Sequence, residues 1–308
     1  MNIGILGTGA MASFYAAKLG QSYDCTIIGT WKEQLSTIEN DGLELIENGL
    51  SVIVDINTLN YNDINNHSFD ILFIQTKTYQ NKAVIGIINQ LVHEGSIIIN
   101  LQNGAGNKQF FESNIKKGHY IQATTTQAAF IEKPGLVRET GKGTINIPES
   151  QYSTGIKHLL DDCNFEIEIT TDIDKIIWKK LVINACINPL TALLNINNGE
   201  LVSNQSIHVI FRKVCQECDD ILDELKVSLE TNAYNLSSKV ASFTADNSSS
   251  MRNDIKNEKP TEIGSIVGYM LSLSSQKHIY LPQMLEWIKS YDSTINYKEL
   301  LLQIEETK

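Results

Sequence analysis

The chain has 308 residues, with 25 Lys and Arg against 36 Asp and Glu and a net charge of −11. A hydrophobic fraction of 42% with 5 prolines is typical of a globular protein with a packed core, and the length favours two domains. The acidic balance argues against a nucleic-acid binder or a protein that binds anionic membranes, because both need a basic face. Collagen-like, repetitive and low-complexity compositions are excluded as well.

The amino terminus has no cationic segment ahead of its first apolar run, so we expect no signal peptide, and we expect no apolar run long enough to span a bilayer. Five scattered cysteines favour a reducing compartment, and we therefore predict a cytoplasmic protein. Cys215 and Cys218 form a C-x-x-C within a helical stretch, which we interpret as one partly buried thiol and one near the surface. The six histidines have no metal-ligand spacing, so we expect no metal site.

Short β-rich runs alternate with helical ones in the amino-terminal part of the chain. The expected strands are 2–7, 25–30, 69–77, 96–104 and 119–128, with helices near 11–20 and 80–93. This alternation predicts a mainly parallel sheet with crossover helices. Glu47-Asn48-Gly49 separates two alternating runs within 42–55 and predicts a hairpin.

Two further strand-like segments, 136–148 and 165–171, precede a change of pattern. From about Asp172 onward the period is almost entirely helical, which places a domain boundary near residues 168–172. The predicted fold class is therefore α/β: a Rossmann-like, doubly wound domain over 1–170, followed by an all-α domain over 171–308.

The first strand leads directly into a G-x-G-x-x-A motif, formed by Gly7, Thr8, Gly9, Ala10, Met11 and Ala12. The first glycine suits the tight turn, the second lets a pyrophosphate approach the backbone, and the small alanine permits close helix–strand packing. The motif opens a helix whose amino terminus favours phosphate groups. Since a strand–turn–helix context is what such a motif requires, these residues predict a dinucleotide site.

The end of the second strand distinguishes the two nicotinamide dinucleotides, because an acidic residue there binds the ribose diol and repels a 2′-phosphate. This strand ends in Thr30-Trp31-Lys32, with no acid at its tip. Thr30 and Lys32 are able to bind a 2′-phosphate, which favours NADP(H). Glu33 follows at once and weakens this preference, and the alternative for Lys32 is an ordinary solvated lysine.

Two more polar residues lie at the ends of predicted strands. Lys77 is the last residue of 69–77, and Asn103 lies at the end of 96–104. Ligands of open α/β sheets bind outside the carboxyl ends of the strands. We therefore expect both residues on the same rim as the glycine loop.

A candidate chemical site lies in the apolar helical segment 177–192. Lys180, Asn184 and Asn188 stand four residues apart, so they form one polar line on that helix. A lysine in such a place is able to protonate a developing alkoxide, and amides are able to hold a carboxylate and a hydroxyl. The alternative is that Lys180 extends to solvent and the asparagines satisfy backbone groups near Pro189.

A second polar cluster near the carboxyl end contains Asn247, Ser250 and Glu262. A helical turn would point Asn247 and Ser250 the same way, whereas a loop or helix cap is the common role of such serines. Composition alone leaves this cluster unassigned.

With these segments in view, the chain resembles the ketopantoate reductase (2-dehydropantoate 2-reductase) family. The resemblance covers nearly the whole length of the chain. It is carried by the segments ILGTGAM, QTK, QNG, ATTTQAAF, WKKLVINACINPLTALLNINNGEL and SSMRNDIKNEKPTEI. It implies a second domain like the carboxyl-terminal domain of 6-phosphogluconate dehydrogenase, a small 2-oxo acid substrate and a homodimer as one possibility. It also implies that Lys180 is the general acid and that Glu262 is a catalytic residue that contacts substrate and cofactor. Lys77 is expected near the nicotinamide and Lys32 at the 2′-phosphate. Further substrate or cofactor contacts are expected from Asn103, Asn184, Asn188, Asn247 and Ser250.

The sequence departs from the family pattern at three places. Lys32 stands where the family usually has an arginine, Lys259-Pro260 replaces the arginine before the T-E-I motif, and Gly264 replaces the acid that follows it. A lysine makes a weaker phosphate contact than a bidentate arginine, so the preference for NADPH is expected to be looser.

The function that the sequence predicts is the NADPH-dependent reduction of ketopantoate to pantoate, a step of pantothenate and coenzyme A biosynthesis. Two alternatives stay open: a related NADP-dependent dehydrogenase that acts on another 2-oxo or 3-hydroxy acid, and an NADP-sensing protein without turnover.

Overall fold

The computed structural model describes residues 1–291 of the chain, and contacts divide it into two compact units. The first unit contains Met1–Gln102 and Asn107–Ile173. The second unit contains Asn103–Gly106 and the chain from Asp174 onward. Each unit is described by itself.

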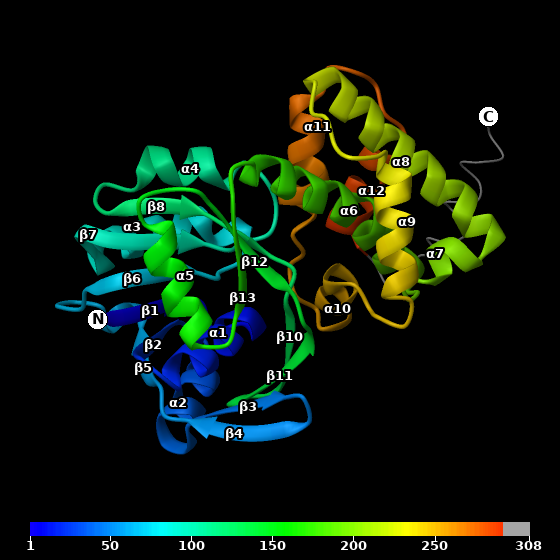
Figure 1. Cartoon of the computed structure of the whole chain (residues 1–308). Helices are drawn as coiled ribbons and strands as arrows, with labels where there is room; N and C mark the ends of the chain where they lie inside the picture. The colour runs from blue at the N-terminus through cyan, green and yellow to red at the C-terminus, as the bar shows by residue number, and fades with distance from the viewer. Residues whose placement is uncertain (292–308) are drawn as a thin grey trace. The chain divides into compact units, whose positions relative to one another are not determined.

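The first unit is built on a six-stranded sheet, which Figure 1 shows in blue to cyan. Its strand order is β5-β2-β1-β6-β7-β8, and all five neighbouring pairs are parallel. The strands are β1 (Asn2–Leu6), β2 (Asp24–Gly29), β5 (Asn57–Asn60), β6 (Phe69–Ile74), β7 (Val92–Asn100) and β8 (His119–Gln122). The order reverses at β1, where a doubly wound sheet opens its ligand crevice.

Helices cover both faces of this sheet, because successive strand residues point to opposite sides. Ile5 packs in one core with residues of α1 and α5, whereas Leu6 packs in another with residues of α3 and α4. The helices are α1 (Ala10–Gly20), α2 (Lys32–Asp41), α3 (Asn81–Leu91), α4 (Asn107–Asn114) and α5 (Ser153–Asp162). The predicted mainly parallel, doubly wound architecture is confirmed.

Two smaller sheets complete the first unit. One has the order β10-β11-β3-β4 and the other β13-β12-β9. Their strands are β3 (Leu43–Glu47), β4 (Leu50–Val54), β9 (Thr124–Thr125), β10 (Ala128–Lys133), β11 (Leu136–Gly141), β12 (Thr144–Pro148) and β13 (Glu166–Thr170), and short 3-10 turns η1 (Tyr61–Asp63) and η2 (Thr78–Gln80) lie between larger elements.

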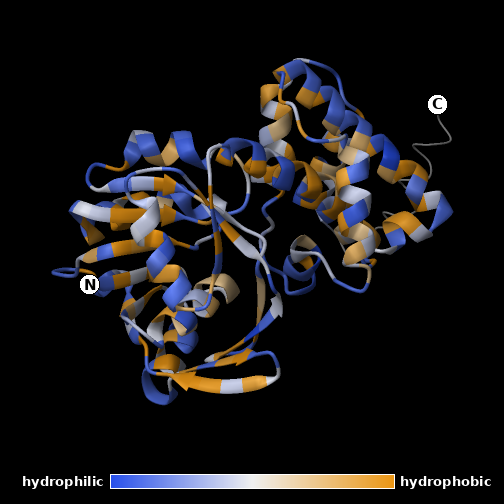
Figure 2. Ribbon diagram, viewed as in Figure 1, coloured by the Kyte–Doolittle hydropathy of each residue, from blue (hydrophilic) through white to orange (hydrophobic). Residues whose placement is uncertain are grey.

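The predicted hairpin is confirmed as β3 and β4, in which Glu47 pairs with Leu50. Asn48 and Gly49 both have positive φ, 53° and 78°, as a tight hairpin turn requires. Figure 2 colours much of β4 as hydrophobic, and its edge side chains Leu50 and Ile53 are exposed.

The second unit is helical, and its described part contains no strand. Its elements are α6 (Ile173–Leu194), α7 (Glu200–Ser203), α8 (Gln205–Leu225), α9 (Ala233–Phe243), α10 (Ser250–Lys256), the π-helix η3 (Gly264–Gly268), α11 (Tyr269–Leu273) and α12 (Tyr280–Lys289). α6 and α8 form the centre of one hydrophobic core with Met284 and Ile288 of α12. The predicted all-α second part is confirmed.

Helix α6 has the length and composition of a membrane span, with a mean hydropathy of 1.2. The expectation that no apolar run reaches this length is therefore wrong. In the structure 61% of that segment is buried inside the protein, and it supplies core residues such as Leu181 and Leu190. A core helix of a folded domain meets the same criteria, so composition alone does not distinguish the two.

The C-x-x-C pair is buried more deeply than predicted. Cys215 and Cys218 are both fully buried, and the Sγ atoms of Cys186 and Cys218 lie 3.6 Å apart. The placement of one thiol near the surface is wrong, because α8 turns both toward the apolar core. Among the residues that the structure describes, no cluster of His, Cys, Asp or Glu is suited to a metal ion.

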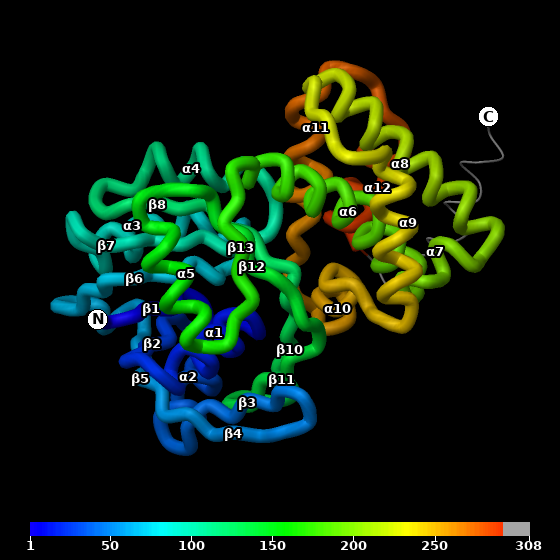
Figure 3. Tube along the Cα trace, viewed as in Figure 1, coloured from blue at the N-terminus to red at the C-terminus, as the bar shows by residue number. Residues whose placement is uncertain are grey.

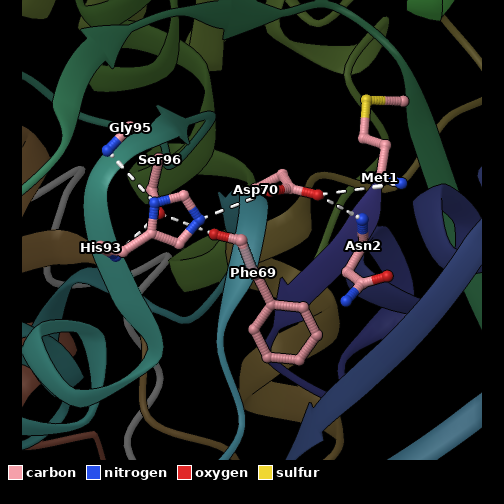
Figure 4. Close-up of polar contacts among 7 residues, drawn as sticks. All are labelled: Met1, Asn2, Phe69, Asp70, His93, Gly95 and Ser96. Atoms are coloured by element: carbon pink, nitrogen blue, oxygen red, sulfur yellow. Dashed lines mark hydrogen bonds and ion pairs between the residues drawn. The ribbon is translucent and has the colours of Figure 1, made fainter.

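A polar cluster joins the amino ends of β1, β6 and β7 (Figure 4). The Asp70 carboxylate accepts a hydrogen bond from the Asn2 backbone N–H at 2.8 Å, and His93 Nε2 lies 3.4 Å from it. Ser96 donates to the Phe69 carbonyl at 2.7 Å. The Asn2 N–H, together with His93, holds the pKa of Asp70 below its usual value. This edge of the sheet is opposite the carboxyl rim, so the cluster fixes strand ends.

Candidate functional site

The glycine loop of the first unit has the backbone that a dinucleotide site needs. Gly7 has φ +132°, and a Cβ there would lie 2.9 Å from the Gln75 carbonyl oxygen. A Cβ on Gly9 would meet no atom within 4 Å, so the space in front of this residue is open. Gly9 is the N-cap of α1, and within the described structure no side chain caps it and no acid lies in its first turn. The loop therefore presents helix N–H groups that suit a phosphate.

The rest of the motif serves packing. Ala12 is fully buried in the core beneath the loop, while Ala10 and Met11 are partly accessible. The Thr8 side chain lies against Gly29, where a Cβ would come within 2.5 Å of Thr8 Cγ2. Gly29 thus lets the ends of β1 and β2 approach each other. The conformation of residues 7–12 is compatible with the predicted pyrophosphate loop.

The residues predicted to select the cofactor follow β2 directly. Thr30 and Lys32 are exposed, and Trp31 is the N-cap of α2 with Lys32 as the first helical residue. Thr30 through Lys32 thus lie next to Gly29, which contacts the glycine loop. This is where the adenosine ribose of a dinucleotide bound to such a loop lies.

A buried amide network ties the β6 and β7 ends of the rim together. Gln102 Nε2 donates to Thr76 Oγ1 at 3.0 Å and to Asn81 Oδ1 at 2.7 Å, and Asn81 Nδ2 donates to Asn107 Oδ1 at 3.1 Å. Beside it, the Lys77 backbone N–H donates to Gln80 Oε1 at 3.1 Å. Lys77 thus stands at the carboxyl rim as predicted. Gln102 holds the ends of β6 and β7 together, and its place in the Q-N-G segment was the one local signal for it.

In the second unit, a short loop carries Asn103 to Glu262. Asn103 Nδ2 donates to Glu262 Oε2 at 3.4 Å. The loop needs glycine at two places: Gly104, with φ +87°, where a Cβ would lie 2.8 Å from the Ser265 carbonyl oxygen, and Gly106, with φ +86°, where it would lie 2.5 Å from the Tyr269 ring. The close approach of this backbone to η3 and α11 therefore brings the Asn103 amide within reach of the carboxylate.

Glu262 is itself held by the turn that follows it. Its carbonyl oxygen accepts hydrogen bonds from the Ser265 N–H and the Ile266 N–H, each at 3.1 Å, and from Ser265 Oγ at 3.0 Å. The side chain of Glu262 is 7% exposed. The π-helix η3 begins two residues later, and such helices are frequent at functional sites. Ser265 thus fixes the backbone of Glu262, and no local sequence pattern marks it.

Lys180 lies on α6, where it is half-buried and its surroundings include the Glu262 carboxylate. Burial lowers the pKa of Lys180 from its ordinary value to about 8, and Glu262 acts against this shift by stabilising the charged form. A lysine with such a pKa is mostly protonated near neutral pH and gives up its proton readily. The structure thus brings together Lys180, Glu262 and Asn103 from three separate segments.

Asn184 and Asn188 continue the polar line of α6, one and two turns after Lys180. Asn188 is buried and Asn184 is partly accessible. The helical spacing that predicted this line is confirmed. Pro189 follows Asn188 inside α6. The helix ends at Leu194, before Asn195, whose φ is 53°.

The cluster around Asn247 forms a loop and a helix cap. Asn247 lies in the coil before α10, and both Asn247 and Ser250 are exposed. Ser249, which sequence reasoning did not select, is the buried member: it receives a 2.7 Å hydrogen bond from Thr191 of α6. Of the two roles that the sequence left open, the structure has the loop and helix cap, because Ser249 caps α10 and the helix starts only at Ser250.

A groove of about 1110 Å³ opens beside this region within the second unit. Arg252, Lys256, Lys259 and Lys289 line it together with Glu258, so it is basic in an otherwise acidic chain. The positions at which this sequence departs from the family pattern, Lys259-Pro260 and Gly264, also line it.

Comparison with known families matches both halves of the chain. The family model described as "Ketopantoate reductase PanE/ApbA" matches residues 3–152, and its carboxyl-terminal counterpart matches residues 172–286. The 2-dehydropantoate 2-reductase of Bacillus subtilis (strain 168) is 29% identical over 96% of this chain and 99% of its own length. That of Listeria innocua is 30% identical over 92% of this chain and 93% of its own length.

Solved structures show the same fold. A 2-dehydropantoate 2-reductase from Bacillus subtilis, described as probable, has a TM-score of 0.77 at 27% identity and covers 95% of this chain and all of its own. A D-mandelate dehydrogenase with NADH and anilino(oxo)acetate has a TM-score of 0.86 at 22% identity over 98% of this chain and 99% of its own, a likeness of fold alone.

These matches confirm the expected enzyme class and, at the level of the family, NADP(H) as the cofactor. Two family models that together span most of the chain, and relatives matched over almost their full length, leave no large segment outside the resemblance. The chain belongs to the ketopantoate reductase family of oxidoreductases.

Proposed function

We propose that this protein reduces 2-dehydropantoate to pantoate with NADPH, as a step in the synthesis of pantothenate and coenzyme A. The observation that carries the proposal is Lys180, a desolvated lysine whose pKa lies at about 8 and whose surroundings include the Glu262 carboxylate. Membership of the family supports the reaction class. A proton donor of this kind is what reduction of a ketone requires.

Lys180 acts as the general acid. NADPH, held at the glycine loop, would supply a hydride for C2 of the oxo acid, and the carbonyl oxygen would then gain negative charge. The Lys180 ammonium stabilises that charge and donates a proton from Nζ to the oxygen. The oxygen thereby becomes the C2 hydroxyl of pantoate. Because burial weakens the hold of Lys180 on its proton, the transfer is easier than from a solvated lysine.

Polar side chains of the second unit orient the substrate in this proposal. Asn184 and Asn188 follow Lys180 along α6, and Asn247 and Ser250 stand before and at the start of α10. Amide and hydroxyl groups bind a carboxylate and a hydroxyl without adding charge that would compete with the acid. Glu262, held by Asn103 and by η3, supports the charged form of Lys180 and contacts the substrate.

The first unit holds the dinucleotide in this proposal. The loop from Gly7 to Ala12 receives the pyrophosphate, and Thr30 with Lys32 receives the 2′-phosphate. Lys77 contributes on the nicotinamide side, and in the second unit Asn103 and Glu262 are proposed as cofactor contacts as well. The open space at Gly9 and the uncapped start of α1 support this placement.

A second candidate is a related reductase that acts on another 2-oxo or 3-hydroxy acid. Gly264 favours it: the family's acid is missing two residues after Glu262, and the space that a side chain would fill there is open. A non-catalytic NADP sensor is disfavoured, because the Lys180–Glu262 pair is retained and family members are enzymes.

A substrate and cofactor panel tests the proposal. NADPH oxidation by the purified protein is followed with ketopantoate and with other 2-oxo acids, and each is repeated with NADH. Turnover that is fastest with ketopantoate and NADPH supports the proposal. Turnover with a different oxo acid favours the second candidate, and cofactor binding without turnover of any acid favours the sensor.

We also propose a cytoplasmic homodimer that takes only small molecules as substrates, with no nucleic-acid or membrane partner. A dimeric ketopantoate reductase from Staphylococcus aureus has the same fold, with a TM-score of 0.76 at 22% identity over 98% of this chain and all of its own. Light scattering of the purified protein measures the oligomeric state directly, and a monomeric mass contradicts the dimer.

A further inference from the structure

The loop that carries Asn247 is bound along its length to the segment that follows α6. The Asn198 N–H donates to the Asn247 carbonyl at 3.1 Å, and the Gly199 N–H donates to the Ala245 carbonyl at 3.0 Å. A Cβ on Gly199 would come within 2.7 Å of Ala245 Cβ, so the two backbones touch. Figure 3 traces the chain from α9 through this loop into α10.

A buried hydroxyl pair forms a second link between the same segments. Thr191 Oγ1 donates to Ser249 Oγ at 2.7 Å, and Ser249 Oγ accepts the Arg252 N–H at 3.2 Å as the cap of α10. Thr191 lies one turn beyond Asn188 on α6. The start of α10 is thus joined to the helix that bears the predicted substrate amides.

The Arg252 side chain makes the third and largest link. Its Nε donates to Asn195 Oδ1 at 2.9 Å, its Nη1 to Asn197 Oδ1 at 2.5 Å, and its Nη2 to the Asn195 carbonyl at 3.0 Å. These acceptors lie where α6 ends, at the left-handed Asn195. A planar guanidinium reaches all three at once, whereas a lysine ammonium at the same place lacks the fork geometry.

We infer that Arg252 is a positioning residue for substrate binding. Its guanidinium locks the start of α10, and with it Asn247 and Ser250, against the end of α6, which carries Asn184 and Asn188. The inference rests on the proposed function, because it requires Asn247 and Ser250 to contact the oxo acid. Arg252 itself acts through its asparagine partners, so its shape matters more than its charge.

The physical reason is the precision that binding demands. Asn247 and Ser250 are exposed and lie outside any regular element or at the first residue of a short one, so local structure alone holds them weakly. Without the guanidinium, the loop keeps its backbone bonds to residues 198 and 199 and the bond from Thr191 to Ser249, but the start of α10 loses its three bonds to Asn195 and Asn197. Small displacements of positioning groups reduce rate or binding by large factors.

The experiment compares R252M and R252K with the parent and with K256A in the full-length protein. Lys256 is the matched control, since it is an exposed cation on the same helix. For each protein we measure kcat, the KM for ketopantoate, the Kd for NADPH and the melting temperature. R252M is expected to raise the KM for ketopantoate roughly tenfold, with kcat and the Kd for NADPH nearly unchanged.

R252K is expected to fall closer to R252M than to the parent, because it keeps the charge but loses the fork. K256A is expected to match the parent. A parental KM in R252M overturns the inference, and so does full recovery in R252K, since charge alone would then suffice. Should R252M fail to fold, N197A removes only the Nη1 acceptor, and a parental KM in both N197A and R252K overturns the inference equally.

N247A and S250A, measured beside these variants, separate this inference from the proposed function. An increased KM in N247A or S250A with a parental KM in R252M defeats only the positioning role. A parental KM in both N247A and S250A removes the loop from the substrate site, which defeats the positioning role and the assigned contacts together. Turnover of ketopantoate by the parent enzyme tests the proposed reaction separately.

Discussion

Asn103 and Glu262 are 159 residues apart in the chain, yet Asn103 Nδ2 donates a hydrogen bond to Glu262 Oε2 at 3.4 Å. The contact depends on the backbone of Gly104 and Gly106, which lies against η3 and α11 where side chains have no room. It fixes the carboxylate that acts on Lys180. The candidate site of the second unit therefore depends on a loop that sequence order places far from it.

Replacing Lys180 tests the general acid. K180A is expected to lower kcat on the order of 10²–10⁴-fold and to change the Kd for NADPH little, since loss of one proton donor costs about that much. Steady-state kinetics and cofactor fluorescence measure the two quantities. K179A is the matched control, because Lys179 is the adjacent lysine, half-exposed and paired with Glu230. Near-parental turnover in K180A contradicts the assignment.

The pH dependence follows from the lowered pKa of Lys180. Only the protonated ammonium is able to donate, so kcat/KM is expected to be highest below about pH 8 and to fall as the pH rises through that value. In E262Q the support of the carboxylate for the charged form is lost, and the falling limb is expected at lower pH. A profile that is flat through pH 9, or a limb unmoved by E262Q, argues against this pair.

The glycine at position 104 is expected to matter for catalysis more than for folding. G104A places a methyl group against the Ser265 carbonyl at a positive φ, which displaces Asn103 from Glu262 and lowers kcat. G49A is the control: Gly49 has a similar φ of +78°, but a Cβ there meets no atom within 4 Å. Both changes strain the backbone by about 1 kcal/mol, and G104A adds the contact with the Ser265 carbonyl. A fall in kcat in folded G104A, with parental kcat in G49A, supports the site.

Gly9 offers a test of the dinucleotide loop that leaves stability intact. G9A adds a methyl group in open space, so the melting temperature is expected to stay near the parental value. The same methyl group obstructs the approach of a pyrophosphate, so the KM for NADPH is expected to rise at least about tenfold. G155A, which also adds a Cβ in open space, is the control. Unchanged NADPH binding in G9A places the cofactor elsewhere.

Lys32 is expected to set the cofactor preference. K32A is expected to raise the KM for NADPH several-fold and to leave the KM for NADH nearly unchanged, because only NADPH carries the 2′-phosphate. Lys117 precedes β8 at the opposite edge of the sheet, so K117A serves as the control cation. Equal effects of K32A on both cofactors show that Lys32 does not contact the 2′-phosphate.

The sequence was a good guide wherever function is built from one continuous segment. The glycine loop, the hairpin at Asn48-Gly49 and the polar line from Lys180 to Asn188 depend on turn chemistry or helical period, and each is visible in neighbouring residues. At Asn247 and Ser250 the sequence left a helical turn and a loop with a helix cap as alternatives, and tertiary structure decided between them. There the cap by Ser249 and its bond to Thr191 decide where α10 begins, and no local pattern shows that partner.

What the sequence determined by itself is therefore the fold class, the glycine turn between β1 and α1 and the helix that carries Lys180, because propensity, period and turn residues act over a few positions. Tertiary structure alone decided the lowered pKa of Lys180, the meeting of Asn103 with Glu262, and the attachment of Arg252 to Asn195 and Asn197. Desolvation and hydrogen bonds between distant segments exist only once the chain has packed.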